Sequence, residues 1–193
     1  MRRLVLLLAV LWAAGCRPDP AAELLAETFG GEPGLLATDG KPFRLADHPD
    51  EIKLLFFGYT TCPDVCPMAL GRAAAVAREL DHRGGKQLAE KLLVLFVSID
   101  PARDTPEKLT EYLSFFGVRG VGLLGTEEQV AATAAAYGAH FERIASRSAV
   151  GYLIDHTTYL YLIDRQGRVR RLVRSDDAVE RIASWVETLA EES

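Results

Sequence analysis

A short apolar run that leads through a cysteine-bearing turn into a helix constrains this chain more than any other feature. Residues 52–59 are rich in aromatic and branched side chains, which is typical of a buried strand. The alanine-rich segment 68–80 predicts a helix. Between them lie Cys62 and Cys66, each followed by a proline. Because backbone N–H donors and the helix dipole converge at such a turn, we expect a reactive site there.

The turn alone leaves the chemistry of the two cysteines open. If Pro67 is the first helical residue, Cys66 occupies the N-cap position, where a thiolate is favoured over a thiol. Two such groups can form a disulfide, carry out redox chemistry or bind a soft metal ion. A purely structural disulfide explains the pair poorly, since closing so short a loop adds little stability to a domain of this size.

The N-terminal residues predict export from the cytoplasm. Arg2 and Arg3 precede an apolar run at residues 4–14, which is too short to span a bilayer because a spanning helix needs about 20 residues. Small residues then end at Cys16, as at the cleavage site of bacterial lipoproteins. We therefore predict a lipoprotein signal peptide at residues 1–15. The alternative is an ordinary signal peptide, with Cys16 unmodified.

This prediction implies a location for the protein, and the location bears on the chemistry expected of Cys62 and Cys66. A lipid on Cys16 would anchor the chain at the extracytoplasmic face of the cell membrane, within the cell envelope. Cys62 and Cys66 then remain as one pair in a compartment that is normally oxidising. Partners at this location include the membrane itself. Nucleic acid is not expected as a partner, because the net charge is −5.

The rest of the chain predicts one α/β domain behind a flexible tether. Proline and glycine punctuate residues 16–32, which we interpret as the tether, and residues 33–193 as the domain. A small β-hairpin is expected at 35–45, and residues 139–151 give no clear pattern. The pattern further predicts strands at 52–59, 92–99, 121–124, 158–163 and 168–173 and helices at 68–80, 108–116, 127–137 and 176–189, the last capped by Ser175. This order favours a thioredoxin-like fold, with a central mixed sheet flanked by helices.

A soft metal ion would need a third ligand besides the two cysteines. His48 and His82 lie in predicted turns, and His140 follows a helix without supporting residues. His156 lies between two apolar segments, directly before a predicted strand, in a loop that approaches the cysteine turn in thioredoxin-like folds. A solvated loop histidine is the alternative interpretation of His156.

Three motifs of the chain resemble those of the copper-binding Sco/SenC family, whose members assist assembly of cytochrome c oxidase. They are Cys-Pro-x-x-Cys-Pro in residues 56–68, Asp-Pro-x-Arg-Asp-Thr in residues 97–105, and Asp-His-Thr in residues 154–164. The resemblance extends from about residue 33 to the C-terminus. It implies a thioredoxin-like fold that binds copper, as Cu(I) or Cu(II).

The resemblance also assigns roles to individual residues. It implies that Cys62, Cys66 and His156 are the copper ligands. Asp64 and Asp155 match further motif positions, and we expect them to orient the ligands or act on them electrostatically.

Two functions compete. The first is a metallochaperone that delivers copper to the CuA centre of cytochrome c oxidase, with the CuA-bearing subunit as partner and another copper donor upstream. The second is a thiol–disulfide reductase that keeps the CuA-ligand cysteines reduced, with Cys62 and Cys66 cycling through a disulfide and a thiol reductant as partner. The three-residue spacer between the cysteines and the metal-competent histidine favour the metallochaperone.

The last hairpin of the chain is rich in arginine. We interpret it as a solvated surface, and a docking surface for an acidic partner or lipid headgroups is the alternative. The arginines are Arg165, Arg168, Arg170, Arg171 and Arg174.

Overall fold

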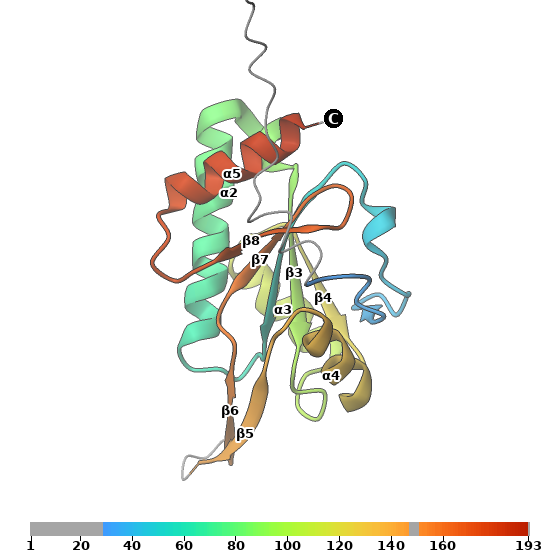
Figure 1. The fold of residues 1–193 in the computed structure, drawn as a ribbon. Coiled ribbons are helices and arrows are strands. Elements are labelled where there is room, and N and C mark those ends of the chain that lie inside the picture. Colours follow the sequence, from blue (N-terminus) through green and yellow to red (C-terminus); the bar gives the residue numbers. More distant parts are fainter. Residues whose placement is uncertain (1–28, 147–150, 193) are drawn as a thin grey trace, which may run out of the picture.

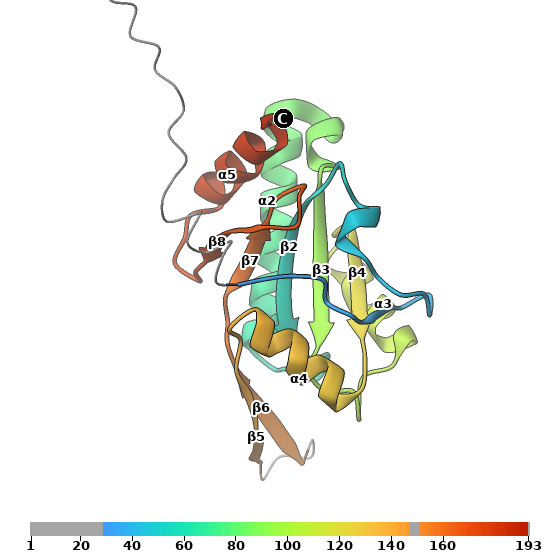
Figure 2. The ribbon, with the colours of Figure 1, turned by 45° about the vertical axis from the view of Figure 1, so that its right-hand side comes forward.

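The computed structural model describes residues 29–146 and 151–192, which form a six-stranded mixed sheet, a separate two-stranded ribbon and flanking helices (Figures 1 and 2). Across the sheet the strands are β1 (Leu36–Ala37), β4 (Gly120–Leu124), β3 (Leu92–Ser98), β2 (Ile52–Gly58), β7 (Leu160–Ile163) and β8 (Val169–Val173). Strands β2, β3 and β4 run parallel to one another, whereas β1, β7 and β8 pair antiparallel with their neighbours. The ribbon consists of β5 (Phe141–Ala145) and β6 (Tyr152–His156).

Helices cover both faces of the sheet, as the sequence predicted. They are η1 (Leu45–Asp47), α2 (Val65–Ala89), α3 (Pro106–Phe115), α4 (Glu127–Ala136) and α5 (Val179–Glu191). Helices α2 and α3 connect successive parallel strands and lie on the same face, because both crossovers are right-handed. Helix α5 packs against α2, and α4 covers the opposite face (Figure 2).

The centre of the core is made by β2 and β3, in which every residue is buried. The strands pair in parallel register from Ile52 opposite Leu92 to Gly58 opposite Ser98. Their carboxyl ends therefore lie side by side at one end of the sheet. The cysteine turn follows β2 there, and the loop at residues 99–105 follows β3.

Only part of the predicted N-terminal hairpin is present. The backbone N–H of Ala37 donates to the Lys41 carbonyl at 2.8 Å, and an isolated bridge joins Leu36 to Pro42. Only the first arm is a strand, β1, which extends the sheet by pairing with β4.

The end of the predicted tether contacts the domain at the turn before β8. Gly30 forms a bridge with Arg168, and the Tyr137 hydroxyl donates to the Gly31 carbonyl at 2.8 Å. Cys16 and the predicted signal peptide lie outside the described residues. Within residues 29–146 and 151–192, no helix has the length and apolar character needed to cross a membrane.

Two helix starts differ from the predictions. Helix α2 begins at Val65 with Asp64 as its N-cap, so Cys66 is its second residue. Pro67 is accepted in this first turn because its missing N–H has no partner to lose there. Helix α5 begins at Val179 after Ala178, and Ser175 does not cap it.

Helix α2 is longer than the predicted segment 68–80 at both ends. Helical geometry continues beyond residue 80 and breaks at Gly85, whose φ of 72° is readily adopted only by glycine.

The first strand of the ribbon, β5, lies in the segment 139–151 that the sequence left unassigned, and β6 follows directly after that segment. Four of the five residues of β5 are exposed, so one face of the strand buries too little to produce an alternating apolar pattern. The sequence prediction missed both strands of the ribbon: β5 is exposed on both faces, and the buried face of β6 is only a few residues long.

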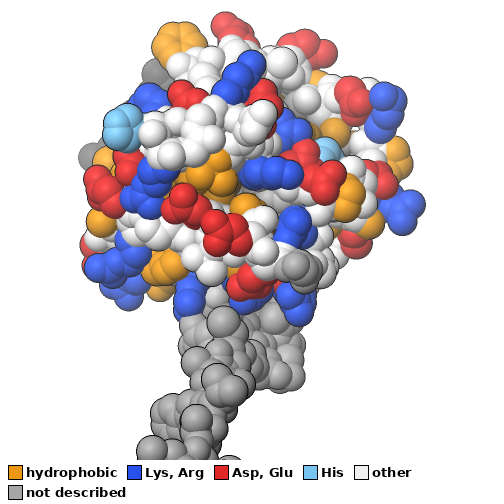
Figure 3. Space-filling model, turned by 90° about the horizontal axis from the view of Figure 1, so that it is seen from above, with side chains coloured by type: hydrophobic (Ala, Val, Ile, Leu, Met, Phe, Trp, Pro, Cys, Tyr) orange, Lys and Arg blue, Asp and Glu red, His pale blue; other side chains and the backbone are white. Residues whose placement is uncertain are grey.

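The arginine-rich hairpin is largely neutralised by nearby acids. Arg168 and Arg170 both pair with the buried Asp164, Arg170 also pairs with Glu192, and Arg174 pairs with a neighbouring aspartate. At this end of the molecule, basic and acidic side chains are interspersed (Figure 3). These ion pairs favour the solvated-surface interpretation.

Candidate metal centre

The two cysteines are held by the junction between β2 and α2. The backbone N–H of Cys62 donates to the Tyr59 carbonyl at 3.2 Å, which closes the turn. Cys66 is fully buried, Cys62 is 8% exposed, and neither forms a disulfide. The core strand and the first turn of the helix thus fix both thiols in place.

Gly58, the last residue of β2, leaves the space in which the Cys66 sulfur lies. A β-carbon at this position would lie 2.9 Å from Cys66 Sγ and 2.8 Å from the Phe56 ring. Such contacts are closer than packed side chains allow, so any other residue would displace the sulfur. The sequence analysis did not identify Gly58. Its place at the end of a mostly apolar strand, just before the cysteine turn, was the available signal.

His156 reaches the same point from the ribbon. It is the last residue of β6 and is 9% exposed. Its ring packs edge-on against Phe56 and Tyr59, with ring centroids 5.7 and 6.0 Å away. The backbone N–H of Ile154 donates to the Tyr59 hydroxyl at 3.2 Å, which ties the strand to the cysteine turn.

The orientation of the His156 ring makes one nitrogen available as a ligand. Nδ1 lies 2.9 Å from the Thr157 carbonyl, and because a carbonyl oxygen can only accept, Nδ1 carries the proton. In the neutral tautomer that this contact selects, Nε2 keeps a lone pair, and it lies 3.6 Å from Cys66 Sγ. The three ligand atoms of Cys62, Cys66 and His156 all lie within 4.8 Å of one another.

The pKa values of the two cysteines are shifted in opposite directions. A hydrogen bond from the Cys66 thiol to the Cys62 sulfur lowers the pKa of Cys62 far below that of a free cysteine despite burial, and the backbone N–H groups of Asp64 and Cys66 lower it further. The same hydrogen bond, together with burial and the negative charge on Cys62, raises the pKa of Cys66. In the reduced protein, Cys62 is therefore the thiolate and Cys66 the thiol.

The other histidines lie apart from this cluster. His48 stacks on Phe43 and contacts Glu51 near the start of β2, at the opposite end of the sheet. His82 is exposed on α2, and His140 is exposed before β5. Among the described residues, Cys62, Cys66 and His156 are the group of cysteine, histidine and acidic side chains that could hold a metal ion.

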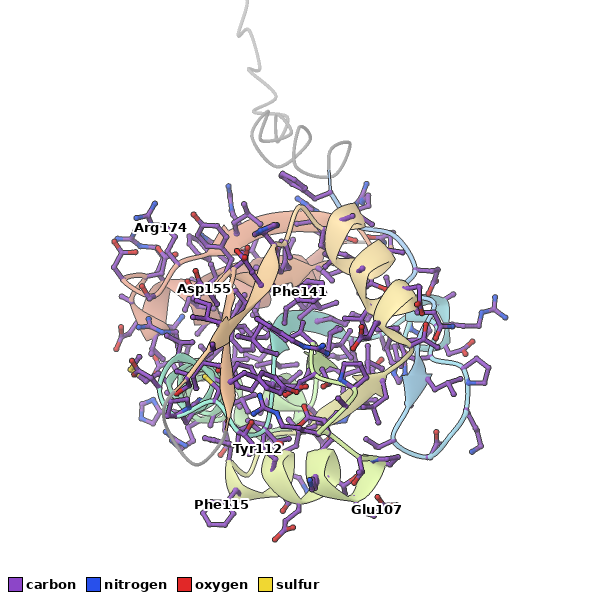
Figure 4. All side chains as sticks on the ribbon, turned by 90° about the horizontal axis from the view of Figure 1, so that it is seen from below. Glu107, Tyr112, Phe115, Phe141, Asp155 and Arg174 are labelled. Carbon is purple, nitrogen blue, oxygen red and sulfur yellow. The ribbon has the colours of Figure 1, made fainter. Side chains whose placement is uncertain are left out.

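The two aspartates expected around the ligands are both exposed. Asp64 is the N-cap residue of α2 and contributes its backbone N–H to Cys62. Asp155 precedes His156 in β6, so its side chain points to the opposite face of the ribbon. Figure 4 views this end of the molecule and labels Asp155.

The Asp-Pro-x-Arg-Asp-Thr loop is hydrogen-bonded to the cysteine turn through Asp104. Asp104 is buried and accepts hydrogen bonds from the Thr60 backbone N–H at 3.2 Å and from the Thr60 hydroxyl at 2.5 Å. The Ser98 hydroxyl donates to the same carboxylate at 2.6 Å. The loop after β3 thereby holds the cysteine turn at Thr60, two residues before Cys62.

The donor set suits copper and does not complete a structural zinc site. Two sulfurs and one imidazole nitrogen are soft or borderline ligands, which Cu(I) accepts in a low-coordinate complex. A structural zinc site takes four protein ligands, and this cluster offers three. The Cys-Cys-His cluster is thus a site that could bind copper.

Comparison with known proteins decides the family. The SCO1/SenC family model matches residues 21–191. The chain belongs to the SCO1/SenC family. Among its relatives, the mitochondrial protein SCO2 of Saccharomyces cerevisiae is 39% identical over 141 residues, which cover 72% of this chain and 46% of that protein. Protein SenC of Rhodobacter capsulatus is 35% identical over 151 residues, covering 78% of this chain and 65% of that protein. The chain thus spans less than two thirds of either relative.

Solved structures confirm the fold of this SCO1/SenC chain. Bradyrhizobium japonicum ScoI, solved with copper bound, superposes with a TM-score of 0.72 at 32% identity, covering 83% of this chain and 99% of ScoI. The resemblance inferred from the three motifs and the prediction of a thioredoxin-like fold with a mixed sheet are both confirmed.

Proposed function

We propose that this protein is a copper metallochaperone of the cell envelope that acts in cytochrome c oxidase assembly. It binds one copper ion through Cys62, Cys66 and His156 and delivers it to the CuA centre of the oxidase. The observation that carries this proposal is the convergence of the three ligand atoms within 4.8 Å in a SCO1/SenC chain. Copper bound to the related ScoI supports it.

The site is suited to ligand exchange. Cu(I) bound by two sulfurs and one nitrogen leaves room for an incoming sulfur or nitrogen from an acceptor. Copper binding requires both sulfurs in reduced form, so a Cys62–Cys66 disulfide would compete with the metal. Another copper donor and a thiol reductant would therefore act before this protein.

A thiol–disulfide reductase that keeps the CuA-ligand cysteines reduced is the second candidate. The unequal acidity of the two thiols favours it, since a thiolate beside a protonated thiol is the arrangement that dithiol exchange uses. The Cys62 thiolate would attack an oxidised CuA disulfide, forming a mixed disulfide and releasing one thiolate. Cys66 would then displace the second thiolate, leaving a Cys62–Cys66 disulfide that an external thiol reductant must reduce.

Replacing His156 separates the two functions while leaving both thiols intact. Copper-loaded wild type and His156→Ala would each be mixed with a pre-reduced apo CuA domain, so that no reductant is needed. We expect CuA absorbance to form with wild type and to be lost or strongly reduced with His156→Ala. His140→Ala is the matched control, because His140 lies beside the ribbon but outside the ligand cluster.

The reverse assay distinguishes the alternative. Dithiol exchange needs no imidazole at position 156, so a reductase would reduce an oxidised CuA domain equally well with or without His156. If both proteins do so, and neither forms CuA on the reduced acceptor, the reductase function is correct and the metallochaperone proposal is wrong.

We further propose that Cys16 is lipid-modified and anchors the chain at the extracytoplasmic face of the cell membrane. The support is the short apolar run that ends in Ala-Ala-Gly-Cys at residue 16. Mass spectrometry of the membrane fraction should find a diacylglyceryl adduct on Cys16 that Cys16→Ser lacks. A mature chain with an unmodified Cys16 would refute the anchor.

A further inference from the structure

The ribbon that carries His156 lies outside the central sheet. Strands β5 and β6 pair only with each other and project from one end of the molecule (Figure 1). A two-stranded ribbon on its own is marginally stable in water. The position of the imidazole therefore depends on side-chain contacts between the ribbon and the body of the domain.

The strongest of these contacts centre on Tyr152, at the start of β6. Its hydroxyl donates to Asp100 Oδ1 at 2.6 Å, and its carbonyl accepts from Arg103 Nη1 at 3.0 Å. The guanidinium of Arg103 lies over the tyrosine ring, with its central carbon 3.7 Å from the ring centroid. One residue of the ribbon thus receives three contacts from the loop after β3.

The loop side of this arrangement is preassembled. The Asp100 side chain is fully buried and forms an ion pair with Arg103. The backbone N–H of Asp100 donates to the Ser98 hydroxyl at 3.2 Å. Because the acid and the arginine hold each other, the aromatic ring and hydroxyl of Tyr152 meet a fixed surface.

The same loop also holds the cysteine turn. Asp104 binds Thr60, two residues before Cys62, while Asp100 and Arg103 bind the ribbon four residues before His156. The Asp-Pro-x-Arg-Asp-Thr segment therefore contacts both halves of the metal centre and supplies no ligand itself.

We propose that Asp100, Arg103 and Tyr152 form a latch that seats the ribbon and sets the distance of His156 from the two cysteines. The three are positioning residues, and their effect on copper rests on the proposed function. In the apo protein the latch keeps the ribbon docked. With copper as cargo, it determines how firmly the imidazole is held against the metal.

Tyr152→Leu tests the latch from the ribbon side and leaves the buried Asp100–Arg103 pair intact. Hydrogen exchange of the reduced apo protein would follow the amides of Ile154 and Thr157, which donate to Tyr59 Oη and the His140 carbonyl. We expect exchange at both amides to accelerate by about tenfold or more, with buried α5 amides unchanged. The Cu(I) dissociation constant, measured against a chelator, should rise about 10- to 100-fold.

Three further variants make the test specific. Tyr159→Leu removes a half-exposed tyrosine on the other side of His156 and should change either quantity less than about twofold. Tyr152→Phe keeps the ring under the guanidinium and should fall between wild type and Tyr152→Leu. Arg103→Lys keeps a charge beside Asp100 but loses the planar stacking, so the ribbon should loosen while the melting temperature changes little.

The outcomes separate the latch from the proposed function. If Tyr152→Leu and Arg103→Lys match Tyr159→Leu in amide exchange and Cu(I) affinity, the latch is wrong. If Tyr152→Phe equals wild type, the Asp100 hydrogen bond has no part in it. If wild type binds copper no better than His156→Ala, the proposed copper site fails, while amide exchange of the apo protein still reports whether the latch exists.

Discussion

The two halves of the metal centre are built in different ways. The cysteines lie at the end of β2, whose every residue is buried in the sheet, and at the start of a long helix. The histidine lies on a ribbon that is outside the sheet and largely exposed in β5. Moving the sulfurs would require disturbing the core, whereas moving the imidazole requires only that the ribbon shift. The difference teaches that the thioredoxin-like core fixes the two sulfurs, whereas the position of the imidazole depends on how the ribbon packs against the rest of the domain.

The largest effect should come from the difference in pKa between Cys62 and Cys66, the two cysteines at the end of the sheet. Because the pKa of Cys62 is lowered, its thiolate persists as the pH falls below the ordinary cysteine range, while the raised pKa keeps Cys66 protonated. At pH 6 an ordinary thiol is less than about 1% thiolate. We therefore expect iodoacetamide to modify Cys62 at pH 6 more than about tenfold faster than Cys66, as measured by mass spectrometry of the anaerobic reduced protein.

The control for this prediction removes the hydrogen-bond donor. In Cys66→Ala the Cys62 sulfur loses the thiol that stabilises its charge, so alkylation of Cys62 at pH 6 should slow and its pH midpoint should rise. Equal modification of both cysteines in wild type across pH 5–8 would show that the turn does not differentiate them.

A medium effect is expected where the core approaches a ligand most closely. Gly58→Ala places a β-carbon against Cys66 Sγ and the Phe56 and Phe96 rings, so the core must shift. We expect the free energy of unfolding to fall by about 1–3 kcal/mol in urea titrations, because overpacking a dense core costs that much.

Gly71→Ala is the matched control for that substitution. Gly71 lies in α2, and a β-carbon added there would meet no other segment of the chain within 4 Å, so alanine should stabilise the helix by up to about 1 kcal/mol. If Gly58→Ala is as stable as Gly71→Ala, the core around Cys66 at the end of β2 is less rigid than its packing indicates.

The smallest effect should come from the outer face of the ribbon. Asp155 adjoins His156 in sequence, but its side chain is exposed on the other face of β6. We expect Asp155→Asn to change the Cu(I) dissociation constant less than about twofold, since an exposed charge is screened by water. A tenfold loss in a chelator competition would instead show that this carboxylate acts on the ligand.

The sequence predicted the two halves of the site unequally, and for physical reasons. Strand β2 and the cysteine turn were found because the buried strand is apolar except for Lys53 and a pair of cysteines is rare. His156 was identified, but as a loop residue, since β5 is largely exposed and the buried face of β6 is too short to produce a clear alternating pattern. Gly58 was missed because it acts by having no side chain, which leaves room for the Cys66 sulfur. The link from Asp100 to Tyr152 was missed because it joins segments far apart in sequence, which only the folded chain brings together.

The bridge between Gly30 and Arg168 has a consequence for how the domain would stand on a membrane. It brings the start of the described chain to the turn before β8, beside the first residues of β2, whereas the metal centre lies at the far end of that strand. The segment between Cys16 and residue 29 can reach at most roughly 45 Å even when fully extended. A lipid on Cys16 would therefore attach the membrane at the pole remote from the Cys-Cys-His cluster, so the anchor itself would leave that cluster uncovered.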